Sequence, residues 1–259
     1  MKMFKDKICV ITGGALGIGR CLTREFAKAG SKVAFIDNND KAGKINLEYL
    51  TSNNSKALFY CGDLAIEEDL KKFSSLVIKE FGSIDFLINN ASINKGGIET
   101  PCSWQDFNRV LQIGVTAPYM LTYLFLPYFN KNSSIVNIIS TRSFMSQPNS
   151  ESYTAAKGAL FSLTHSLAVT LSGKVRVNSI APGWIKTERF YDEPKEFRYN
   201  QNDINQHPSK RIGEAEDIAR ATLFLCDERN SFINGENITV DGGMTKQMIY
   251  SGEHGWDYK

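Results

Sequence analysis

Tyr153 and Lys157 stand four residues apart in the segment YTAAK, with only small residues between them. On an α-helix, positions i and i+4 share one face and lie about 6 Å apart along the axis. A phenol with a pKa near 10 is a weak base at neutral pH, and a nearby ammonium group favours the phenolate. The pair could therefore act as a general acid and base, although the spacing alone also fits an ordinary surface helix.

A second candidate site lies in the segment TGGALGIG, residues 12–19, which follows an apolar run and precedes a helical pattern. Gly13, Gly17 and Gly19 allow a tight turn and a close approach of the backbone to a ligand. Free N–H groups at the start of the helix can bind a pyrophosphate. The segment therefore predicts a dinucleotide-binding loop, and a plain tight turn is the alternative.

Asp37 ends the next apolar run, 18 residues after Gly19. A carboxylate at this distance can accept hydrogen bonds from the adenosine ribose hydroxyls. The same charge repels a 2′-phosphate, and Asn38 and Asn39 add no compensating cation. The sequence predicts NAD(H), preferred over NADP(H), as the cofactor, whereas the alternative is that Asp37 only forms a turn.

Short β-branched runs alternate with amphipathic stretches, and this order must position the candidate residues. The expected strands are 7–12, 32–37, 56–61, 84–89, 134–140, 175–181 and 236–242. The expected helices are 17–30, 65–81, 103–130, 153–172 and 215–226. Most strand candidates are continuously apolar, as in a parallel sheet that is buried on both faces. We therefore predict an α/β fold, a Rossmann-type doubly wound parallel sheet of about seven strands with helices on both faces.

The chain of 259 residues shows no internal repeat, low-complexity tract or linker, so we expect residues 1–259 to form a single domain. The polar, aromatic-rich segment 183–213 has no clear strand, and its length predicts a substrate lid. His207 in this segment is expected to be a solvated loop residue. The C-terminal tail, residues 244–259, is apolar for a free end and is expected to reach a neighbouring subunit.

Composition narrows the classes of partner. The formal net charge of +2 gives no indication of binding to nucleic acid or to an anionic membrane. The five cysteines show neither CxxC pairing nor histidine partners at zinc spacing, which predicts reduced thiols, no metal site and a cytoplasmic protein. No segment is expected to approach the roughly 18 apolar residues of a membrane span, and the N-terminus does not resemble a signal peptide.

Taken together, the motifs resemble the short branch of the short-chain dehydrogenase/reductase family. The matching positions are Thr12, Gly13, Gly17, Ile18 and Gly19 for TGxxxGIG, Asp63 and Leu64 for the adenine-side DL, NNAS at 89–92, YTAAK at 153–157, PGWIKT at 182–187 and VDGG at 240–243. Ser140 stands 13 residues before Tyr153, an offset that favours Ser140 over its neighbour Ser143. The matches follow one another from residue 8 to residue 243, nearly the whole chain.

The resemblance implies direct hydride transfer between a secondary alcohol or ketone and the cofactor. Tyr153 would exchange the hydroxyl proton, Lys157 would tune Tyr153 and hold the nicotinamide ribose, and Ser140 would bond the substrate oxygen. The implied cofactor-binding residues are Gly13, Ala15, Leu16, Gly17, Ile18, Gly19, Asp37, Asn38, Asp63, Leu64, Asn90, Ala91, Ser92, Tyr153, Lys157, Pro182, Gly183, Ile185 and Thr187. The implied role of Thr187 is to bind the carboxamide; it could instead be a simple turn or helix cap. A homotetramer is the family expectation.

Gly114, in RVLQIGVTA at 109–117, departs from the family pattern, where an Asn is expected. That Asn is understood to position a water beside the lysine through its backbone carbonyl. Glycine keeps the carbonyl, so we expect the proton relay to survive, in a helix that Gly114 and Pro118 together disturb. Ser92, where relatives carry Gly, is expected to affect only packing on the adenosine side.

The substrate is the least determined feature. The segments that would select it, 93–98, 141–151 and 183–213, mix apolar with polar side chains. A small-molecule sugar or polyol, a hydroxysteroid and a hydroxyacyl compound all remain candidates. One alternative function is a carbonyl reductase that works physiologically in the reductive direction. Another is a catalytically impaired NAD-binding sensor, for which Gly114 is the only support.

Overall fold

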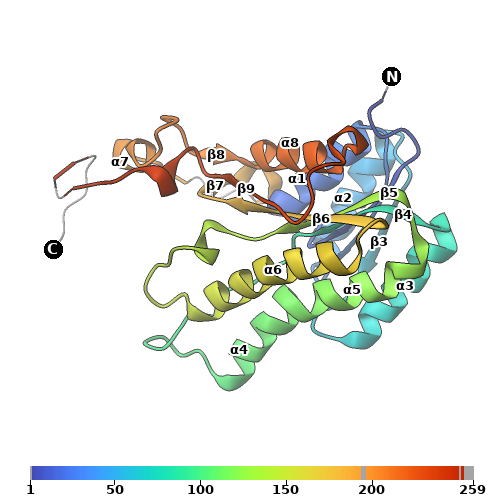
Figure 1. Cartoon of the computed structure of the whole chain (residues 1–259), viewed down its shortest axis with the longest axis horizontal. Helices are drawn as coiled ribbons and strands as arrows, with labels where there is room; N and C mark the ends of the chain where they lie inside the picture. The colour runs from blue at the N-terminus through green and yellow to red at the C-terminus, as the bar shows by residue number, and fades with distance from the viewer. Residues whose placement is uncertain (1, 194–196, 251, 254–259) are drawn as a thin grey trace.

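The protein is described by a computed structural model that covers residues 2–193, 197–250 and 252–253. Seven parallel strands form one sheet in the order β3-β2-β1-β4-β5-β6-β9 (Figure 1). The strands are β1 Ile8–Thr12, β2 Lys32–Asp37, β3 Ala57–Cys61, β4 Ile84–Asn89, β5 Phe129–Ile138, β6 Val175–Pro182 and β9 Asn237–Val240. The predicted doubly wound fold is confirmed.

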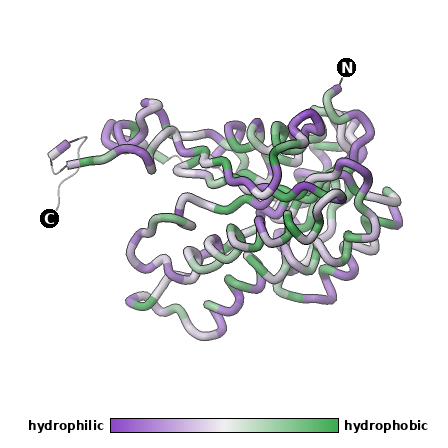
Figure 2. Tube along the Cα trace, viewed as in Figure 1, coloured by the Kyte–Doolittle hydropathy of each residue, from purple (hydrophilic) through white to green (hydrophobic). Residues whose placement is uncertain are grey.

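Helices cover both faces of the sheet, α1, α2 and α8 on one face and α3, α5 and α6 on the other (Figure 1). The helices are α1 Gly17–Lys28, α2 Asp40–Ser52, α3 Glu67–Phe81, α4 Trp104–Leu111, α5 Ala117–Phe125, α6 Glu151–Thr170, α7 Gln201–Asn205 and α8 Ala215–Cys226. The apolar strands lie between these layers, where the tube in Figure 2 is mainly green. Alternate residues of each strand therefore enter opposite cores.

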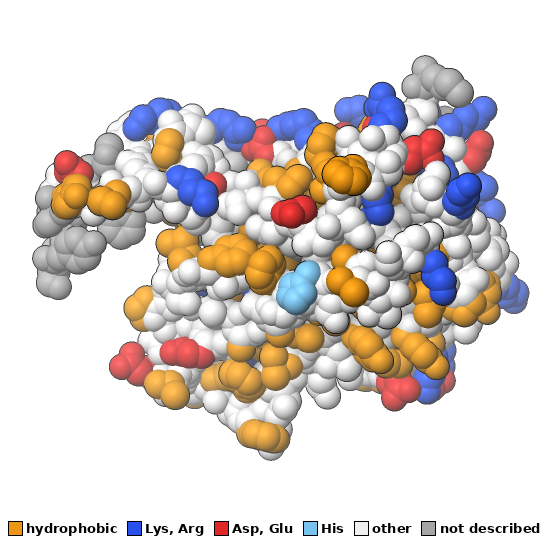
Figure 3. Space-filling model, viewed as in Figure 1, with side chains coloured by type: hydrophobic (Ala, Val, Ile, Leu, Met, Phe, Trp, Pro, Cys, Tyr) orange, Lys and Arg blue, Asp and Glu red, His pale blue; other side chains and the backbone are white. Residues whose placement is uncertain are grey.

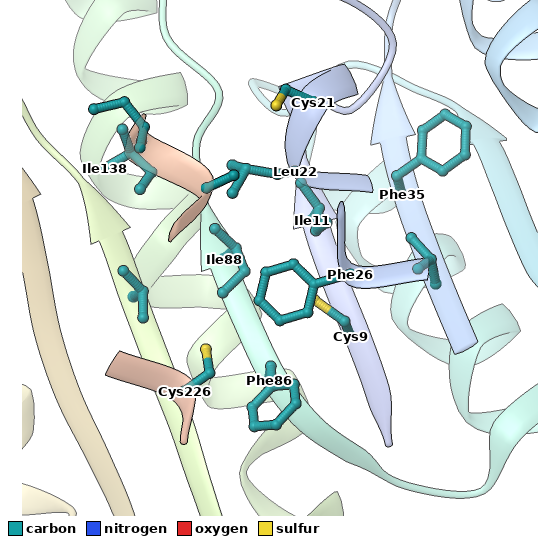
Figure 4. Close-up of a cluster of buried hydrophobic side chains, with 14 of the residues drawn as sticks. Cys9, Ile11, Cys21, Leu22, Phe26, Phe35, Phe86, Ile88, Ile138 and Cys226 are labelled. Carbon is teal, nitrogen blue, oxygen red and sulfur yellow. The ribbon is translucent and has the colours of Figure 1, made fainter. Parts of the chain in front are cut away.

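Two hydrophobic cores follow from this alternation. In β1, Cys9 and Ile11 face the α1 and α8 side, whereas Ile8 and Val10 face the α3 and α5 side. Figure 4 shows the first core, where Phe26 of α1 packs over the sheet with its ring centroid 5.8 Å from that of Phe86. The five cysteines are free thiols.

The order of the strands places a crevice beside the first strand. The chain winds from β1 to β2 and β3 on one side and then returns to β4 on the other side of β1. Ligands of doubly wound sheets bind outside the carboxyl ends of the strands at this reversal. The segments that follow β1, β2, β4 and β5 carry the candidate residues, so the fold gathers them at one edge.

Two sequence expectations need correction. Segment 183–213 is not strandless, because β7, Ile185–Lys186, pairs with β8, Gly213–Glu214, and the segment also holds α7. The stretch Trp104–Tyr128 is long and apolar enough, by length and a mean hydropathy of 1.3, to meet the criterion for a membrane span. It is also a core helix, since α5 lies in the layer that packs on the sheet.

Candidate functional site

Tyr153 lies in the first turn of α6, between two cavities that adjoin it. The groove on one side, with a volume of about 470 Å³, is lined by the glycine loop and the ends of β2 and β4. The cavity on the other side, about 520 Å³, is lined by residues that follow β5 and β6. We call them the dinucleotide groove and the substrate cavity. Tyr153 lines both, so it separates two compartments that a cofactor and a substrate could fill.

Lys157 is buried one helical turn behind Tyr153. Its ammonium donates a hydrogen bond of 2.7 Å to the carbonyl oxygen of Ile138, the last residue of β5. Its Nζ lies 5.6 Å from the centroid of the Tyr153 ring. Lys157 lines neither cavity, so in this structure it supports Tyr153 from the protein interior.

Ser140 follows β5 and brings its hydroxyl to the substrate cavity beside Tyr153. It is the N-cap of the short helix η3, Thr141–Ser143, and its Oγ accepts a 3.2 Å hydrogen bond from the backbone N–H of Arg142. Ser143, the competing serine, lines neither cavity in the described part of the chain. The structure thus brings Ser140 and Tyr153 together.

Burial shifts the pKa values of Tyr153 and Lys157 in opposite directions. Burial raises the pKa of Tyr153, and the Ser140 side chain, the charge of Arg142 and the Ser92 side chain oppose that rise. Burial lowers the pKa of Lys157 from 10.5 to about 7. Arg142 is therefore a second cation beside Tyr153: its Cζ and the Nζ of Lys157 each lie 5.6 Å from the ring centroid.

The glycine loop is shaped to hold an anion against the backbone. Gly13 and Gly17 have φ angles of +66° and +57°, which favour glycine. A Cβ at Gly19 would lie 1.8 Å from the carbonyl oxygen of Gly13. Leu16, the N-cap of α1, makes no side-chain cap, and the first turn carries no acidic residue. The first N–H groups of α1 are thus free to bind a pyrophosphate.

Acidic groups line the adenosine end of the dinucleotide groove. Asp37 accepts 3.0 Å hydrogen bonds from the backbone N–H groups of Ala15 and Asn39, which fix its carboxylate beside the loop. Burial of Asp63 raises its pKa, but hydrogen bonds from Arg109 and the Ala65 backbone outweigh burial and lower it. Within the described chain, no Lys, Arg or His lines this groove.

Most of the predicted cofactor residues line the dinucleotide groove: Gly13, Leu16, Gly17, Ile18, Gly19, Asp37, Asn38, Asp63, Leu64, Asn90, Ala91, Ser92, Tyr153 and Thr187. Gly183 and Ile185 line the substrate cavity instead. Ala15, Lys157 and Pro182 are buried and line neither space. Thr187 is the N-cap residue of η4, Glu188–Phe190: its carbonyl oxygen accepts a 2.9 Å hydrogen bond from the Phe190 N–H, but its side chain makes no cap bond and lines the groove.

Asn90 braces the glycine loop through its side chain and its backbone. Its side-chain amide donates to the carbonyl oxygens of Thr12 and Gly13 at 3.0 and 3.2 Å. Its backbone N–H donates to the Thr12 hydroxyl at 3.0 Å. The end of β4 therefore holds the loop in the conformation that exposes the start of α1.

Gly114 lies in a π-helical turn, η1 Gln112–Thr116, which joins α4 to α5. A Cβ at Gly114 would lie 3.0 Å from the Cβ of Ala156, the residue before Lys157. Such turns occur often at functional sites and bend the helix that contains them. Glycine here allows the helix to pass α6 closely beside Ala156, between Tyr153 and Lys157.

The lid segment is tied to the glycine loop. Arg20, a buried residue of α1, donates to the Asp192 carboxylate at 2.6 Å. The adjacent Tyr191 lines the dinucleotide groove, and its hydroxyl would lie 3.5 Å from a Cβ at Gly17. An ion pair thus holds residues 191–192 beside the glycine loop.

Arg142 and Tyr191 lie in the segments 141–151 and 183–213, which the sequence indicated as substrate-selecting. Arg142 lines the substrate cavity, whereas Tyr191 lines the dinucleotide groove. Ile93 and Asn94, from the segment 93–98, also line the groove. Gly62 and Ile113 line it as well, and the sequence analysis did not single them out. Ser92 acts on the pKa of Tyr153, so the expectation that it affects only adenosine-side packing is wrong.

His207 also differs from expectation. It is buried rather than solvated, and its Nδ1 lies 2.9 Å from the carbonyl oxygen of Asp203. In the tail, Met248 and Tyr250 are exposed, while residues 251 and 254–259, with Trp256 and Tyr258, lie outside the described part. Within the described residues, no cluster of side chains could hold a metal ion.

Comparisons with known proteins agree with this geometry. A family model described as enoyl-(acyl carrier protein) reductase matches residues 13–245. An uncharacterized oxidoreductase of Thermotoga maritima is 38% identical over 258 residues, 96% of this chain and 99% of the relative. Glucose 1-dehydrogenase 2 of Bacillus subtilis is 32% identical over 254 residues, 94% of this chain and 97% of the relative.

Solved structures extend the likeness to three dimensions. An apo SCOR enzyme from Clostridium thermocellum is 38% identical, with a TM-score of 0.87 over 98% of each chain. A blue fluorescent protein from a metagenomic library, in complex with NADPH, is 25% identical, with a TM-score of 0.85 over 93% of this chain and 99% of its own. The chain belongs to the short-chain dehydrogenase/reductase family of oxidoreductases.

Proposed function

We propose that this protein is an NAD(H)-dependent oxidoreductase that interconverts a secondary alcohol and a ketone by direct hydride transfer, with Tyr153 as the acid and base. The observation that carries the proposal is the position of Tyr153, which lines both the dinucleotide groove and the substrate cavity. A phenol at that junction can reach the oxygen of a substrate whose carbon faces the cofactor. Ser140 lines the same cavity and supplies a second hydroxyl.

Each residue of the site has its own part in the proposed reaction. During oxidation, Tyr153 Oη takes the proton of the substrate hydroxyl, and during reduction it returns a proton to the carbonyl oxygen. Ser140 holds that oxygen in place. Lys157 supports Tyr153 from the interior through its bond to Ile138, and the carbonyl of Gly114 continues the path of the proton toward solvent. The nicotinamide, when bound, supplies or accepts the hydride.

The groove fits a dinucleotide, and its charges favour NAD(H). The uncapped start of α1 would hold the pyrophosphate, Asp37 the adenosine ribose, Asp63 and Leu64 the adenine side, and Thr187 the carboxamide. A 2′-phosphate would meet the Asp37 carboxylate without a cation among the described lining residues. The relative that binds NADPH shows that family membership does not decide this preference.

The substrate candidates remain a sugar or polyol, a hydroxysteroid and a hydroxyacyl compound. The similarity to glucose 1-dehydrogenase 2 favours the first. A carbonyl reductase would use the same residues in the opposite direction. An NAD-binding sensor is the weaker candidate, because Ser140, Tyr153 and Lys157 are all present and Tyr153 adjoins both cavities.

We also propose a cytoplasmic homotetramer. The five free cysteines support a reducing compartment. Tyr119 and Tyr123 of α5 and Val169 of α6 are 51, 63 and 77% exposed, and Figure 3 shows hydrophobic side chains over the face that these helices form. Exposed apolar patches on monomeric proteins are typically small, so we expect another subunit to cover this face. Light scattering would give the mass of the assembly.

A panel assay tests the proposed reaction. Polyols, sugars, hydroxysteroids, hydroxyacyl compounds and the matching ketones are incubated with NAD(H) or NADP(H), and the absorbance of the reduced nicotinamide is followed. Turnover of at least one alcohol with NAD⁺ supports an oxidoreductase, and the ratio of forward to reverse rates distinguishes dehydrogenase from reductase. Binding of the cofactor without turnover across the panel would favour the sensor.

A further inference from the structure

The substrate cavity contains one charged side chain among its described lining residues. Its polar members are Ser140, Thr141, Arg142, Ser146, Gln147, Tyr153 and Gln206, and its apolar members include Met145, Trp184, Ile185 and Met244. Figure 3 shows the surface hollowed on the side where the segment after β5 faces α7. Apart from Arg142, the lining residues that the structure describes offer hydroxyl, amide and apolar groups.

Arg142 is held beside the reacting phenol. Its Cζ lies 5.6 Å from the centroid of the Tyr153 ring, and its position on η3 is fixed by the bond from its N–H to Ser140. One guanidinium N–H donates to the side-chain oxygen of Gln147, another residue of the cavity. The guanidinium of Arg142 therefore lies beside Tyr153, the proposed acid and base.

No carboxylate neutralises this guanidinium in the part of the chain that the structure describes. The ion pairs found there involve Arg20, Arg109, Arg189, Arg211, Arg220, Arg229 and several lysines, but not Arg142. A guanidinium has five N–H donors in a planar fork, and Gln147 occupies one of them. The free donors suit a planar anion with two oxygens.

We propose that Arg142 binds a carboxylate of the substrate, carried a few bonds from the carbon that bears the reacting hydroxyl. The inference deepens the proposed function and rests on it: the substrate class becomes a hydroxy acid and its keto acid, with a sugar acid as the polyol member. A carboxylate matches the single positive charge among the described lining residues, whereas a phosphate would bring up to two negative charges to one arginine. A neutral polyol or steroid offers Arg142 no charged partner.

The pocket also explains how such a substrate would be oriented. Ser140 and Tyr153 bind the reacting oxygen at one side of the cavity, and Arg142 fixes the acid group beside them. Two anchors on one small molecule define which face of the reacting carbon turns toward the dinucleotide groove. Arg142 is thus a specificity residue that also acts on Tyr153 through its charge.

Pairs of substrates with one carbon skeleton test the proposal. Gluconate is compared with sorbitol, and 2- and 3-hydroxybutyrate are compared with their methyl esters, using the wild type, Arg142→Gln and Arg142→Lys. We expect wild type to favour at least one acid over its neutral partner by more than tenfold in kcat/KM. Arg142→Gln should lower the value for the acid about 10- to 100-fold, as expected for a lost charged hydrogen bond, and that for the neutral partner far less. Arg142→Lys should restore part of the preference.

Two controls separate recognition from damage to the fold. Arg229→Gln removes a mostly exposed arginine whose ion pair with Asp227 lies away from the cavity, and it should leave the acid-to-neutral ratio unchanged. Trp184 lines the cavity, so its fluorescence reports binding of the acids to the cofactor-free protein. That signal should saturate with the acid, not with its ester, and weaken at least tenfold in Arg142→Gln.

The results distinguish the two proposals. Turnover of neutral alcohols that equals or exceeds turnover of the acids, with a ratio that Arg142→Gln does not change, overturns the carboxylate site and leaves the oxidoreductase intact. An equal loss for acid and ester in Arg142→Gln also overturns it, because the arginine would then act only on Tyr153. Cofactor binding without turnover of any alcohol or ketone, together with no binding of the acids, overturns both.

Discussion

The ammonium group of Lys157 donates a 2.7 Å hydrogen bond to the carbonyl oxygen of Ile138, so the end of β5 holds the lysine behind Tyr153. The same strand end is followed by Ser140, and the same helix carries Tyr153. The end of β5 and the start of α6 therefore position all three residues of the proposed catalytic group. The cost of this arrangement is a buried lysine, whose pKa falls to about 7.

The buried lysine predicts a pH dependence of stability. Its pKa is about 7 in the folded protein and near 10.5 when unfolded, so the unfolded chain binds more protons between these values. The penalty for charging Lys157 is fully present below pH 7 and disappears as pH rises toward 10.5. We expect the contribution of Lys157 to raise the free energy of unfolding across this window. Urea unfolding of wild type and Lys157→Met from pH 6 to 10 measures this contribution. If the free energy of unfolding changes with pH in the same way in both proteins, the expectation is contradicted.

Asp37 should determine the choice of cofactor. Asp37→Asn removes the charge and keeps the planar shape, replacing one carboxylate oxygen with an NH2 group, so repulsion of a 2′-phosphate is lost. We expect the ratio of kcat/KM for NAD⁺ to that for NADP⁺ to fall at least tenfold. Asp40→Asn, on an exposed residue paired with Lys44, is the matched control. Wild type that uses NADP⁺ as well as NAD⁺ would refute the assignment.

Gly114 and Gly158 form a matched pair of helical glycines. A Cβ at Gly114 lies 3.0 Å from Ala156, whereas a Cβ at Gly158 meets nothing within 4 Å. Gly158→Ala should stabilise the protein by about 0.5–1 kcal/mol, because alanine favours the helix. Gly114→Ala should gain less or lose about 1–3 kcal/mol through overpacking against α6. Thermal unfolding compares the two.

The rate of a Gly114→Asn variant tests the proton relay separately. We expect no gain, because the proposed relay uses a backbone carbonyl, which glycine already supplies, and because the longer side chain crowds Ala156. A gain of orders of magnitude in kcat would mean that the relay in the natural protein is broken.

The Arg20–Asp192 ion pair should hold the lid over the cofactor. Asp192→Asn keeps the size of the side chain but leaves the buried Arg20 guanidinium without its charged partner. We expect weaker cofactor binding by roughly 10-fold and a loss of about 1–3 kcal/mol in stability. Calorimetric titration with NADH measures the first. Glu193→Gln, which removes the neighbouring charge, should change neither, and equal effects of both substitutions would exclude the ion pair as the cause.

The sequence was sufficient to predict the sheet and the glycine loop. Both depend on local rules: buried parallel strands are continuously apolar, and Gly13, Gly17 and Gly19 are demanded by backbone angles and a close carbonyl. The 13-residue offset between Ser140 and Tyr153 was likewise informative, because Ser140 follows the end of β5 and Tyr153 lies at the start of α6.

Other features depended on contacts between distant segments. Nothing local in the sequence shows that Arg142 reaches Tyr153 or that burial lowers the pKa of Lys157. The burial of His207 results from packing within the lid, which its polar composition does not reveal. These properties of Arg142, Lys157 and His207 depend on the environment of each side chain in the folded protein, which the residue type alone does not reveal.

The central claim is that Tyr153 exchanges the proton while the dinucleotide groove binds the cofactor. The most direct test compares wild type with Tyr153→Phe, measuring kcat for the best alcohol of the panel and the Kd for NADH in the same preparations. We predict a loss of about 10²- to 10⁴-fold in kcat, the usual contribution of general acid and base catalysis, with Kd changed less than threefold. Turnover that survives the substitution within tenfold of wild type would contradict the account.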